Sequence, residues 1–490
     1  MLVLSITAFV VGAVIMIFEI LGSRLLAPFL GSSVLTWTVV IGTVLGFLSV
    51  GYYWGGLMKN SHKDKLSLLI FFSGLYLFLT GISNRLFLLS ISNSRLEIFS
   101  QTFLSSILIY AVPSVLLGAV TPYILSISIT KITDGARLAG RFYAVSTIGS
   151  IIGTFSAGFF LIPNLGSIRL IYLLAFTLAV LSLIVSKKIY FAKLLLILFS
   201  ILGLIYGWQI NEDKENTVAD IDTSFYRVWI ESSDDPAMKN IKKMYIDGAV
   251  NSVIKEGEDD VLIFPYYYKY YDLVFWNGNR LKEVLMIGGG GMTYPRYFAK
   301  RFPEINMTVV EIDPAMEKIA SDLFDYKKSK SIEVVNQDGR IYLNKTEKKF
   351  DAIMIDAFSG NSLPFHLNSL EALKAMKRKL NESGVVVVNI PGSIEGSKST
   401  LFRSVLTTYK TVFSGVKFFS TYNKKNEGKF QNLIILASDG KLSKIDSLFP
   451  DQGFLREREI KKNIAPGKLL TDDWAPTEYW SAKQFIKTNQ

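Results

Sequence analysis

The stretch EVLMIGGGGMTYPRYFAKRFPEINMTVVEIDP, residues 283–314, contains the pattern on which the fold assignment depends. The apolar runs at its two ends show no alternation, which is typical of strands that are buried on both faces of a parallel sheet. Between them lie four glycines and a segment of helical length. Glycines at such a place let the backbone turn sharply into a helix and approach a ligand closely. We therefore predict a strand, a glycine loop, a helix and a second parallel strand.

The same pattern continues towards the C-terminus. Further apolar runs occur at IEVV (332–335), FDAIMI (350–355) and GVVVVNI (384–390), and helix-like stretches separate them. This order predicts a doubly wound α/β sheet, a Rossmann-like fold. Upstream, alternating residues in 225–232 and 243–255 predict a small antiparallel β-unit with a turn at Asp247-Gly248.

Acidic residues follow the second and third predicted strands. Glu311 lies about 20 residues beyond the glycines, the distance at which a carboxylate usually binds ribose hydroxyls. Asp338 and Gly339 form a turn after the third strand, where the Asp can accept a hydrogen bond from the exocyclic amine of adenine. Together with the backbone of Gly288, Gly289 and Gly290, these residues predict a nucleoside site. No lysine of P-loop type follows the glycines, which favours a nucleoside thioether or sulfonium over a dinucleotide.

The fourth predicted strand ends at Asp356. A carboxylate at this strand end lies where the transferable group of a sulfonium donor would be, and it can accept the proton of an attacking amine. The alternative is that Asp356 only caps the next turn. We expect it to be the catalytic residue.

The composition divides the chain into two parts. Half of the 490 residues are hydrophobic, and the mean hydropathy is +0.31. The apolar excess lies before about residue 210, so we predict a transmembrane helical domain at 1–210, a linker and β-unit at 211–280 and the Rossmann-like domain at 281–490. The chain has no cysteine and two histidines, which argues against disulfides, zinc and any other metal site. The net charge of +11 is better explained by loops near anionic lipid than by nucleic acid.

Apolar runs predict about seven membrane spans, a multi-pass arrangement in the cell membrane. They are residues 4–29, 34–57, 66–89, 99–129, 142–165, 170–185 and 189–208. Gly149 and Gly153 have the spacing that lets two helix backbones approach closely. Glu19 and Arg24 are charged residues within the first span. We expect them to pair with each other, with Arg24 near the helix end, and the alternative is that they face a polar cavity between helices.

Several segments together resemble the spermidine synthase family of aminopropyltransferases. They are IGGGG, VVEIDP, QDGR, FDAIMID and the stretch at 367–390. The resemblance implies that Glu311 holds the ribose, Asp338 the adenine amino group and Gly288 to Gly290 the donor backbone, with Asp356 as general base. It also implies decarboxylated S-adenosylmethionine, or S-adenosylmethionine itself, as the donor substrate.

The helical half has a resemblance of its own. Residues 51–60 and 136–170 look like parts of a six-helix half of a major facilitator transporter. With both halves, the chain looks like the membrane-fused spermidine synthase-like proteins. A single half has no partner half to move against, so we expect anchoring, or presentation of a membrane-borne substrate, instead of transport.

The chain departs from the family where the acceptor would bind. Gly291 and Ser359 stand where the family has aspartates, Asn251 replaces a glutamine, and FPYYYKYYD at 264–272 replaces a Tyr-His-Glu element. Other residues could hold a cationic acceptor instead. The candidates are Asp472, Asp473 and Glu478 near the C-terminus and Tyr267 in the tyrosine run.

Three functions remain open from the sequence. The first is a membrane-anchored transferase that aminopropylates an amine acceptor. The second is a methyltransferase that uses S-adenosylmethionine on a lipid, a membrane protein or a small molecule. The third is a membrane protein that senses a nucleoside without turnover. We expect the lipid bilayer as a partner, a homo-oligomer as an option, and a cytoplasmic catalytic domain because its donor is made in the cytosol.

Overall fold

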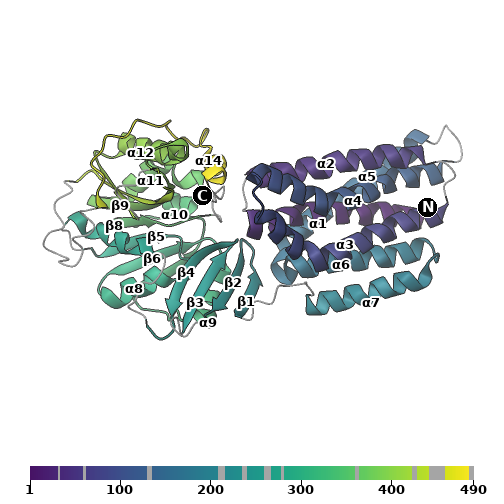
Figure 1. Cartoon of the computed structure of the whole chain (residues 1–490), viewed down its shortest axis with the longest axis horizontal. Helices are drawn as coiled ribbons and strands as arrows, with labels where there is room; N and C mark the ends of the chain where they lie inside the picture. The colour runs from purple at the N-terminus through teal and green to yellow at the C-terminus, as the bar shows by residue number, and fades with distance from the viewer. Residues whose placement is uncertain are drawn as a thin grey trace. The chain divides into compact units, whose positions relative to one another are not determined.

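The computed structural model describes residues 1–30, 34–58, 62–129, 135–207, 216–233, 240–258, 266–277, 281–358, 363–421, 428–440 and 458–484. The chain forms two compact units. The first comprises Met1–Glu215 together with Ile221–Arg227, and the second comprises Asn216–Asp220 and the residues from Val228 onward. Figure 1 shows the helices and strands of each unit, with labels where there is room.

The first unit is a bundle of long apolar helices. Its helices are α1 (Leu2–Leu30), α2 (Val34–Leu57), α3 (Lys63–Ser92), α4 (Ile98–Ser128), α5 (Gly135–Ser156), α6 (Ile162–Val185) and α7 (Tyr190–Tyr206). Among the described residues, five helices are long and apolar enough to cross a membrane. The fifth runs from Gly135 to Val185 because a π-helical turn, η2 (Ala157–Leu161), joins α5 to α6; α7 is shorter, with 17 residues. The predicted helical domain is therefore confirmed, although two predicted spans form one continuous stretch.

Helices α1 and α5 pack with their backbones in close contact. A Cβ atom on Gly149 would lie 2.0 Å from the carbonyl oxygen of Phe9, and one on Gly153 would lie 2.6 Å from that of Ala13. The hydroxyl of Ser150 donates a hydrogen bond to the carbonyl of Gly12 at 3.1 Å. The close approach predicted from the glycine spacing is present, and only glycine fits at these two positions.

The charged residues of α1 do not pair as the sequence suggested. Arg24 donates hydrogen bonds to the backbone carbonyls of Thr223, at 3.1 Å, and Ser224. Both acceptors lie in the 221–227 segment, which belongs to the helical unit. The guanidinium therefore satisfies main-chain oxygens near the end of α1, and Glu19 has no ion-pair partner among the described residues.

The second unit begins with a four-stranded antiparallel sheet in the order β1-β2-β3-β4. Its strands are β1 (Thr217–Asp222), β2 (Arg227–Ser232), β3 (Ile241–Ile246) and β4 (Ala249–Lys255). Asp247 and Gly248 connect β3 to β4 with φ angles of 46° and 89°. Two successive positive φ angles give the tight turn that suits a two-residue hairpin, as the sequence predicted.

A seven-stranded sheet follows, in the order β10-β11-β9-β8-β5-β6-β7. Its strands are β5 (Glu283–Ile287), β6 (Asn306–Glu311), β7 (Ile332–Asn336), β8 (Phe350–Ile355), β9 (Leu380–Gly392), β10 (Gly415–Ser420) and β11 (Gln431–Ser438). Strands β5 to β9 are parallel, and β11 is antiparallel to both of its neighbours. The strand order reverses at β5, because β6 and β7 extend the sheet on one side of β5 and β8 extends it on the other side. The Rossmann-like fold is confirmed, and such a reversal is where open α/β sheets bind ligands.

Apolar side chains cover both faces of this sheet. Leu285 and Ile287 of β5 belong to one hydrophobic cluster, whereas Val284 and Met286 belong to another. Helices α10 (Gly339–Lys345), α11 (Leu370–Lys379) and α12 (Thr400–Val412) contribute to the first cluster, and α8 (Thr293–Arg301) and α9 (Pro314–Leu323) to the second. This two-sided burial explains why the strands read as continuous apolar runs.

Candidate active site at the strand ends

The glycine loop after β5 is held by the carboxylate of Glu311. The backbone N–H groups of Gly289 and Gly290 donate to Oε2 of Glu311 at 2.8 and 3.1 Å, and that of Asp313 donates to Oε1 at 3.1 Å. Glu311 is 5% exposed, and burial raises its pKa although the three hydrogen bonds oppose the rise. One lone pair of Oε1 remains for a further donor such as a ribose hydroxyl.

Two of these glycines have conformations and surroundings that exclude a side chain. Gly288 has a φ of 94°, and a Cβ atom there would lie 2.3 Å from the carbonyl oxygen of Asp356. Gly290 has a φ of 49°, and its Cβ would lie 2.5 Å from Oδ1 of Asn251. The loop thus presents bare backbone between β4 and the end of β8.

Gly291 stands where the resemblance implies an aspartate. A Cβ atom at this position would lie 2.9 Å from the Phe324 ring and 3.1 Å from Cβ of Ser252. A carboxylate would therefore need movement of an aromatic side chain. The departure noted in the sequence is accompanied by tight packing at the same place.

Asp338 follows β7 and caps helix α10. Its Oδ1 accepts a hydrogen bond from the backbone N–H of Ile341 at 3.0 Å, and its Oδ2 lies 3.2 Å from Nε2 of His366. Asn336 is the register partner of Glu311, so Asp338 follows the strand next to Glu311. Gly339 packs against β5, since a Cβ there would lie 2.5 Å from Cγ2 of Ile287.

Asp356 follows β8, on the other side of β5. Its backbone N–H donates to the carbonyl of Ile287 at 2.9 Å, which places it beside the first glycine of the loop. Its Oδ1 accepts a hydrogen bond from the side-chain amide of Asn389 at 3.2 Å, and Oδ1 of Asn389 accepts one from Asn432 at 2.9 Å. A chain of two amides therefore orients the carboxylate predicted to be catalytic.

The tyrosine run forms the 3-10 helix η4 (Tyr266–Asn277). The side chain of Tyr267 lies outside the described residues, as does Ser359. Tyr268 is 3% exposed; burial raises its pKa well above the ordinary value, and the negative charge of Asp356 adds to the rise. Asp272 is buried and accepts a hydrogen bond from the Tyr294 hydroxyl at 3.2 Å. The run is thus largely a packed aromatic segment that brings one neutral phenol close to Asp356.

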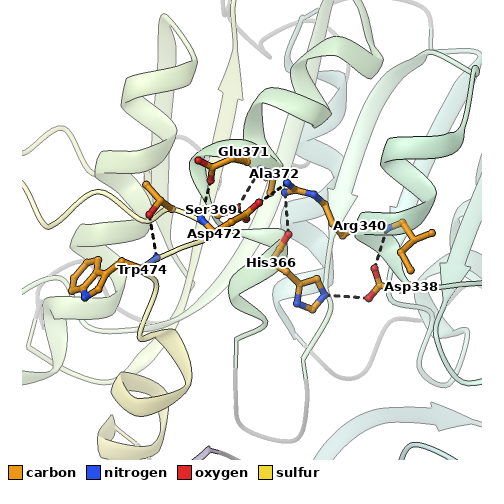
Figure 2. Close-up of polar contacts among 10 residues, drawn as sticks. Asp338, Arg340, His366, Ser369, Glu371, Ala372, Asp472 and Trp474 are labelled. Carbon is orange, nitrogen blue, oxygen red and sulfur yellow. Dashed lines mark hydrogen bonds and ion pairs between the residues drawn. The ribbon is translucent and has the colours of Figure 1, made fainter.

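The acidic residues near the C-terminus are in different environments. Asp472 accepts hydrogen bonds from Arg340, with 2.9 Å between Nη2 and Oδ2, and from the Ser369 hydroxyl. Its backbone N–H donates to Glu371 at 2.9 Å, and Figure 2 shows these contacts side by side. Asp472 therefore joins the C-terminal segment to helices α10 and α11. Asp473 is exposed, and Glu478 is partly buried in α14 (Thr477–Gln484).

Several side chains at the carboxyl ends of the parallel strands have no role predicted from the sequence. His366 contacts Asp338, Asn389 contacts Asp356, and Arg340 connects the His366 carbonyl, at 3.2 Å, to Asp472. The sequence signals for these residues were weak: Arg340 is part of the QDGR segment, and Asn389 is a polar residue after four valines. In the part of the chain that the structure describes, no group of three His, Cys, Asp or Glu side chains could hold a metal ion.

Comparison with known proteins places this part of the chain in a family. Residues 271–442 match the spermine/spermidine synthase domain. A polyamine aminopropyltransferase from Vibrio vulnificus is 32% identical over 186 residues, covering 37% of this chain and 58% of the relative. A probable polyamine aminopropyl transferase from Bifidobacterium longum is 30% identical over 219 residues, covering 40% of this chain and 48% of the relative.

A solved structure, a probable spermidine synthase from Corynebacterium glutamicum, has a TM-score of 0.43 and 20% identity, covering 56% of this chain and 94% of its own. The chain spans about half the length of the two curated relatives. The range that the family model matches nevertheless contains the glycine loop, Glu311, Asp338 and Asp356. The C-terminal part of the chain, residues 271–442, is therefore a spermine/spermidine synthase domain.

Proposed function

We propose that the chain is a membrane-anchored transferase that binds decarboxylated S-adenosylmethionine, or a close relative, and aminopropylates an amine acceptor. The five long apolar helices would anchor it in the cell membrane. Its catalytic domain faces the cytoplasm, where the donor is made. The matched family and the arrangement of the strand ends support this proposal.

The observation that carries the proposal is the position of three carboxylates around one glycine loop. Glu311 ends β6, whereas Asp338 and Asp356 follow β7 and β8, and the loop after β5 contacts Glu311 and Asp356. In this arrangement Glu311 would accept a ribose hydroxyl and Asp338 the adenine amino group. The sulfonium end of the donor would then lie towards Asp356.

The proposed reaction is a direct transfer. The lone pair of the acceptor nitrogen forms a bond to the carbon next to the sulfonium, and the carbon–sulfur bond breaks to leave a neutral thioether. The nitrogen loses a proton to Asp356, which passes it to solvent. Asn389 orients the carboxylate, and the neutral Tyr268 phenol lies close enough to interact with it electrostatically.

Methyl transfer from S-adenosylmethionine is a second candidate, favoured by one observation. Gly291 replaces the aspartate that would bind the propylamine nitrogen of the decarboxylated donor, and its surroundings are packed. A donor that carries a carboxylate in place of a hydrogen does not need that aspartate. The acceptor would then be a lipid, a membrane protein or a small molecule.

Calorimetric titration of the full chain with each donor tests both candidates. We expect the decarboxylated donor to bind more tightly than S-adenosylmethionine. Mass spectrometry after incubation with each donor and a cell extract then identifies the transferred group from the mass added to the acceptor. Binding of neither donor would contradict both candidates.

A further inference from the structure

The helical unit contains a carboxylate without a partner. Glu19 lies well inside the 29-residue helix α1, which contacts α2, α3, α4, α5 and α6. It forms no ion pair with a described residue, because Arg24 turns to the carbonyls of Thr223 and Ser224. An unpaired charge within a membrane span is costly, so a carboxylate at such a place usually marks a site for a cation or a proton.

A second buried group lies next to this carboxylate. Tyr110 of α4 is 0% exposed, and no described atom forms a hydrogen bond with its hydroxyl. The hydroxyl lies 2.6 Å from the place where a Cβ atom on Gly22, one turn after Glu19, would be. Glu19 and Tyr110 are close enough to interact electrostatically, yet they are not bonded to each other. A ligand that donates more than one hydrogen bond would join them.

Helix α2 contributes a third buried group. Cγ1 of Val40 lies 2.7 Å from the position that a Cβ atom on Gly22 would take. Thr43 follows Val40 by three residues and therefore lies on the same side of α2. Thr43 is 5% exposed, and its hydroxyl also lacks a hydrogen-bond partner among the described atoms. Burying hydroxyl groups without partners is unfavourable, so these two hydroxyls favour a ligand that can form hydrogen bonds with them.

The aromatic side chains around these groups limit the class of ligand that could bind beside them. The rings of Phe18 and Tyr110 lie with their centroids 4.7 Å apart. An alkylammonium group has three N–H donors and no acceptor, and it is attracted to aromatic faces. An alkylammonium group therefore needs the partners present here, which are a carboxylate, hydroxyl oxygens and aromatic rings. Hard metal cations instead require six or more oxygen ligands, which these side chains do not supply.

We propose that Glu19, Tyr110 and Thr43 form a binding site for a protonated amine within the helical unit. This site lies in a different unit from the strand-end site and does not depend on the transferase activity. It gives the helical unit a binding role in addition to anchoring.

The test uses the full chain in lipid nanodiscs and n-butylammonium as the probe, titrated by calorimetry. We expect the Glu19→Gln variant to weaken binding by about tenfold or more, because a charge-assisted hydrogen bond is lost. Tyr110→Phe keeps the ring and removes only the hydroxyl, and we expect it to weaken binding by about three- to tenfold.

Glu97→Gln is the matched control, because Glu97 is an exposed carboxylate just before α4 in the same unit. It should bind the probe as the unaltered chain does. If Glu19→Gln fails to fold, Tyr110→Phe decides the question. Equal binding by Tyr110→Phe and the control would overturn the proposal, as would a site that takes up sodium or a proton but no amine. The altered residues lie outside residues 271–442, so any probe bound at the strand-end site contributes equally to every variant.

Discussion

His366 Nε2 lies 3.2 Å from Oδ2 of Asp338, the oxygen that the proposed function assigns to the adenine amino group (Figure 2). The imidazole comes from the segment between β8 and α11, whereas the carboxylate caps α10. A donor that reaches Asp338 must therefore share this oxygen with His366 or displace the ring. The protein's own imidazole thus contacts the oxygen beside which the donor would bind.

Replacement of His366 by alanine should tighten donor binding. The competing contact is partly exposed, and such pairs are worth about 0–1 kcal/mol, so we expect a dissociation constant up to about fivefold lower. Calorimetric titration with the donor measures the change. His62→Ala, in the helical unit, removes the other imidazole and should leave the value unchanged. Weaker binding by His366→Ala would show that the imidazole contacts the donor directly.

Glu311→Gln should loosen the glycine loop. An amide group cannot accept all three of the backbone N–H bonds that the carboxylate receives. A buried N–H left unpaired costs about 1–3 kcal/mol, which corresponds to a donor affinity about 5- to 150-fold weaker. The exposed Glu304→Gln is the control of equal charge change. Unchanged donor affinity would remove the role assigned to Glu311.

Asp356→Asn should abolish turnover while sparing the donor. The amide cannot take a proton from the acceptor nitrogen, and loss of a general base lowers turnover by about 10²- to 10⁴-fold. The contact with Asn389 can persist through the remaining oxygen, so the donor dissociation constant should stay within about twofold. Single-turnover rates and donor titration on the same sample separate the two effects. Activity equal to that of the unaltered chain would show that Asp356 only shapes the turn.

Asp472 and Asp473 form a matched pair of neighbouring carboxylates. Asp472→Ala breaks the contacts with Arg340 and Ser369, and because Asp472 is itself partly exposed to solvent we expect it to lower the free energy of unfolding by about 0.5–1.5 kcal/mol. Asp473 is exposed, and Asp473→Ala should change the stability by less than about 0.5 kcal/mol. Chemical denaturation of the full chain in detergent compares the two. If Asp472→Ala instead raised only the KM for the acceptor, Asp472 would be a substrate ligand.

The fold predicts a pH-dependent contribution from Asp351. Burial opposes its ionisation, but hydrogen bonds from the backbone of Glu283 and Lys282 and from the Asn381 side chain outweigh burial and lower its pKa. A lowered folded-state pKa stabilises the protein above the ordinary Asp value, and this stabilisation is lost as the pH falls through the folded-state value.

Asp351→Asn should therefore destabilise the domain by about 1–2 kcal/mol at neutral pH. The difference from the unaltered chain should shrink below about pH 4, where the unaltered carboxylate becomes protonated in the unfolded state. Denaturation curves at several pH values test this. A difference that does not depend on pH would contradict the assignment.

The sequence allowed prediction of the parallel part of the sheet because each of its five strands is buried on both faces. Strands β10 and β11 were not assigned, although Leu433 to Ala437 form an apolar run. They pair antiparallel to each other at the end of the sheet, without the crossover helix that marked the other strands. Alternation of strand and helix marks the parallel strands in the sequence, and a terminal hairpin lacks that alternation.

The site residues that lie at the ends of strands could be predicted from the sequence. The contacts between side chains from distant segments could not. Glu311, Asp338 and Asp356 each end or follow a strand, so their placement at one edge followed from the sheet. The contact of His366 with Asp338 depends on the path of the chain after β8, and the ion pair of Arg340 with Asp472 joins residues far apart in sequence. No spacing rule in a single sequence predicts such contacts.

The contact of α1 with α5 has a consequence for the biogenesis of the bundle. Helix α1 is synthesised before α5, the helix whose glycines fit its backbone, and α2, α3 and α4 are made between them. The contact at Phe9 and Ala13 therefore forms only after α5 has been made, and the native bundle cannot close before then.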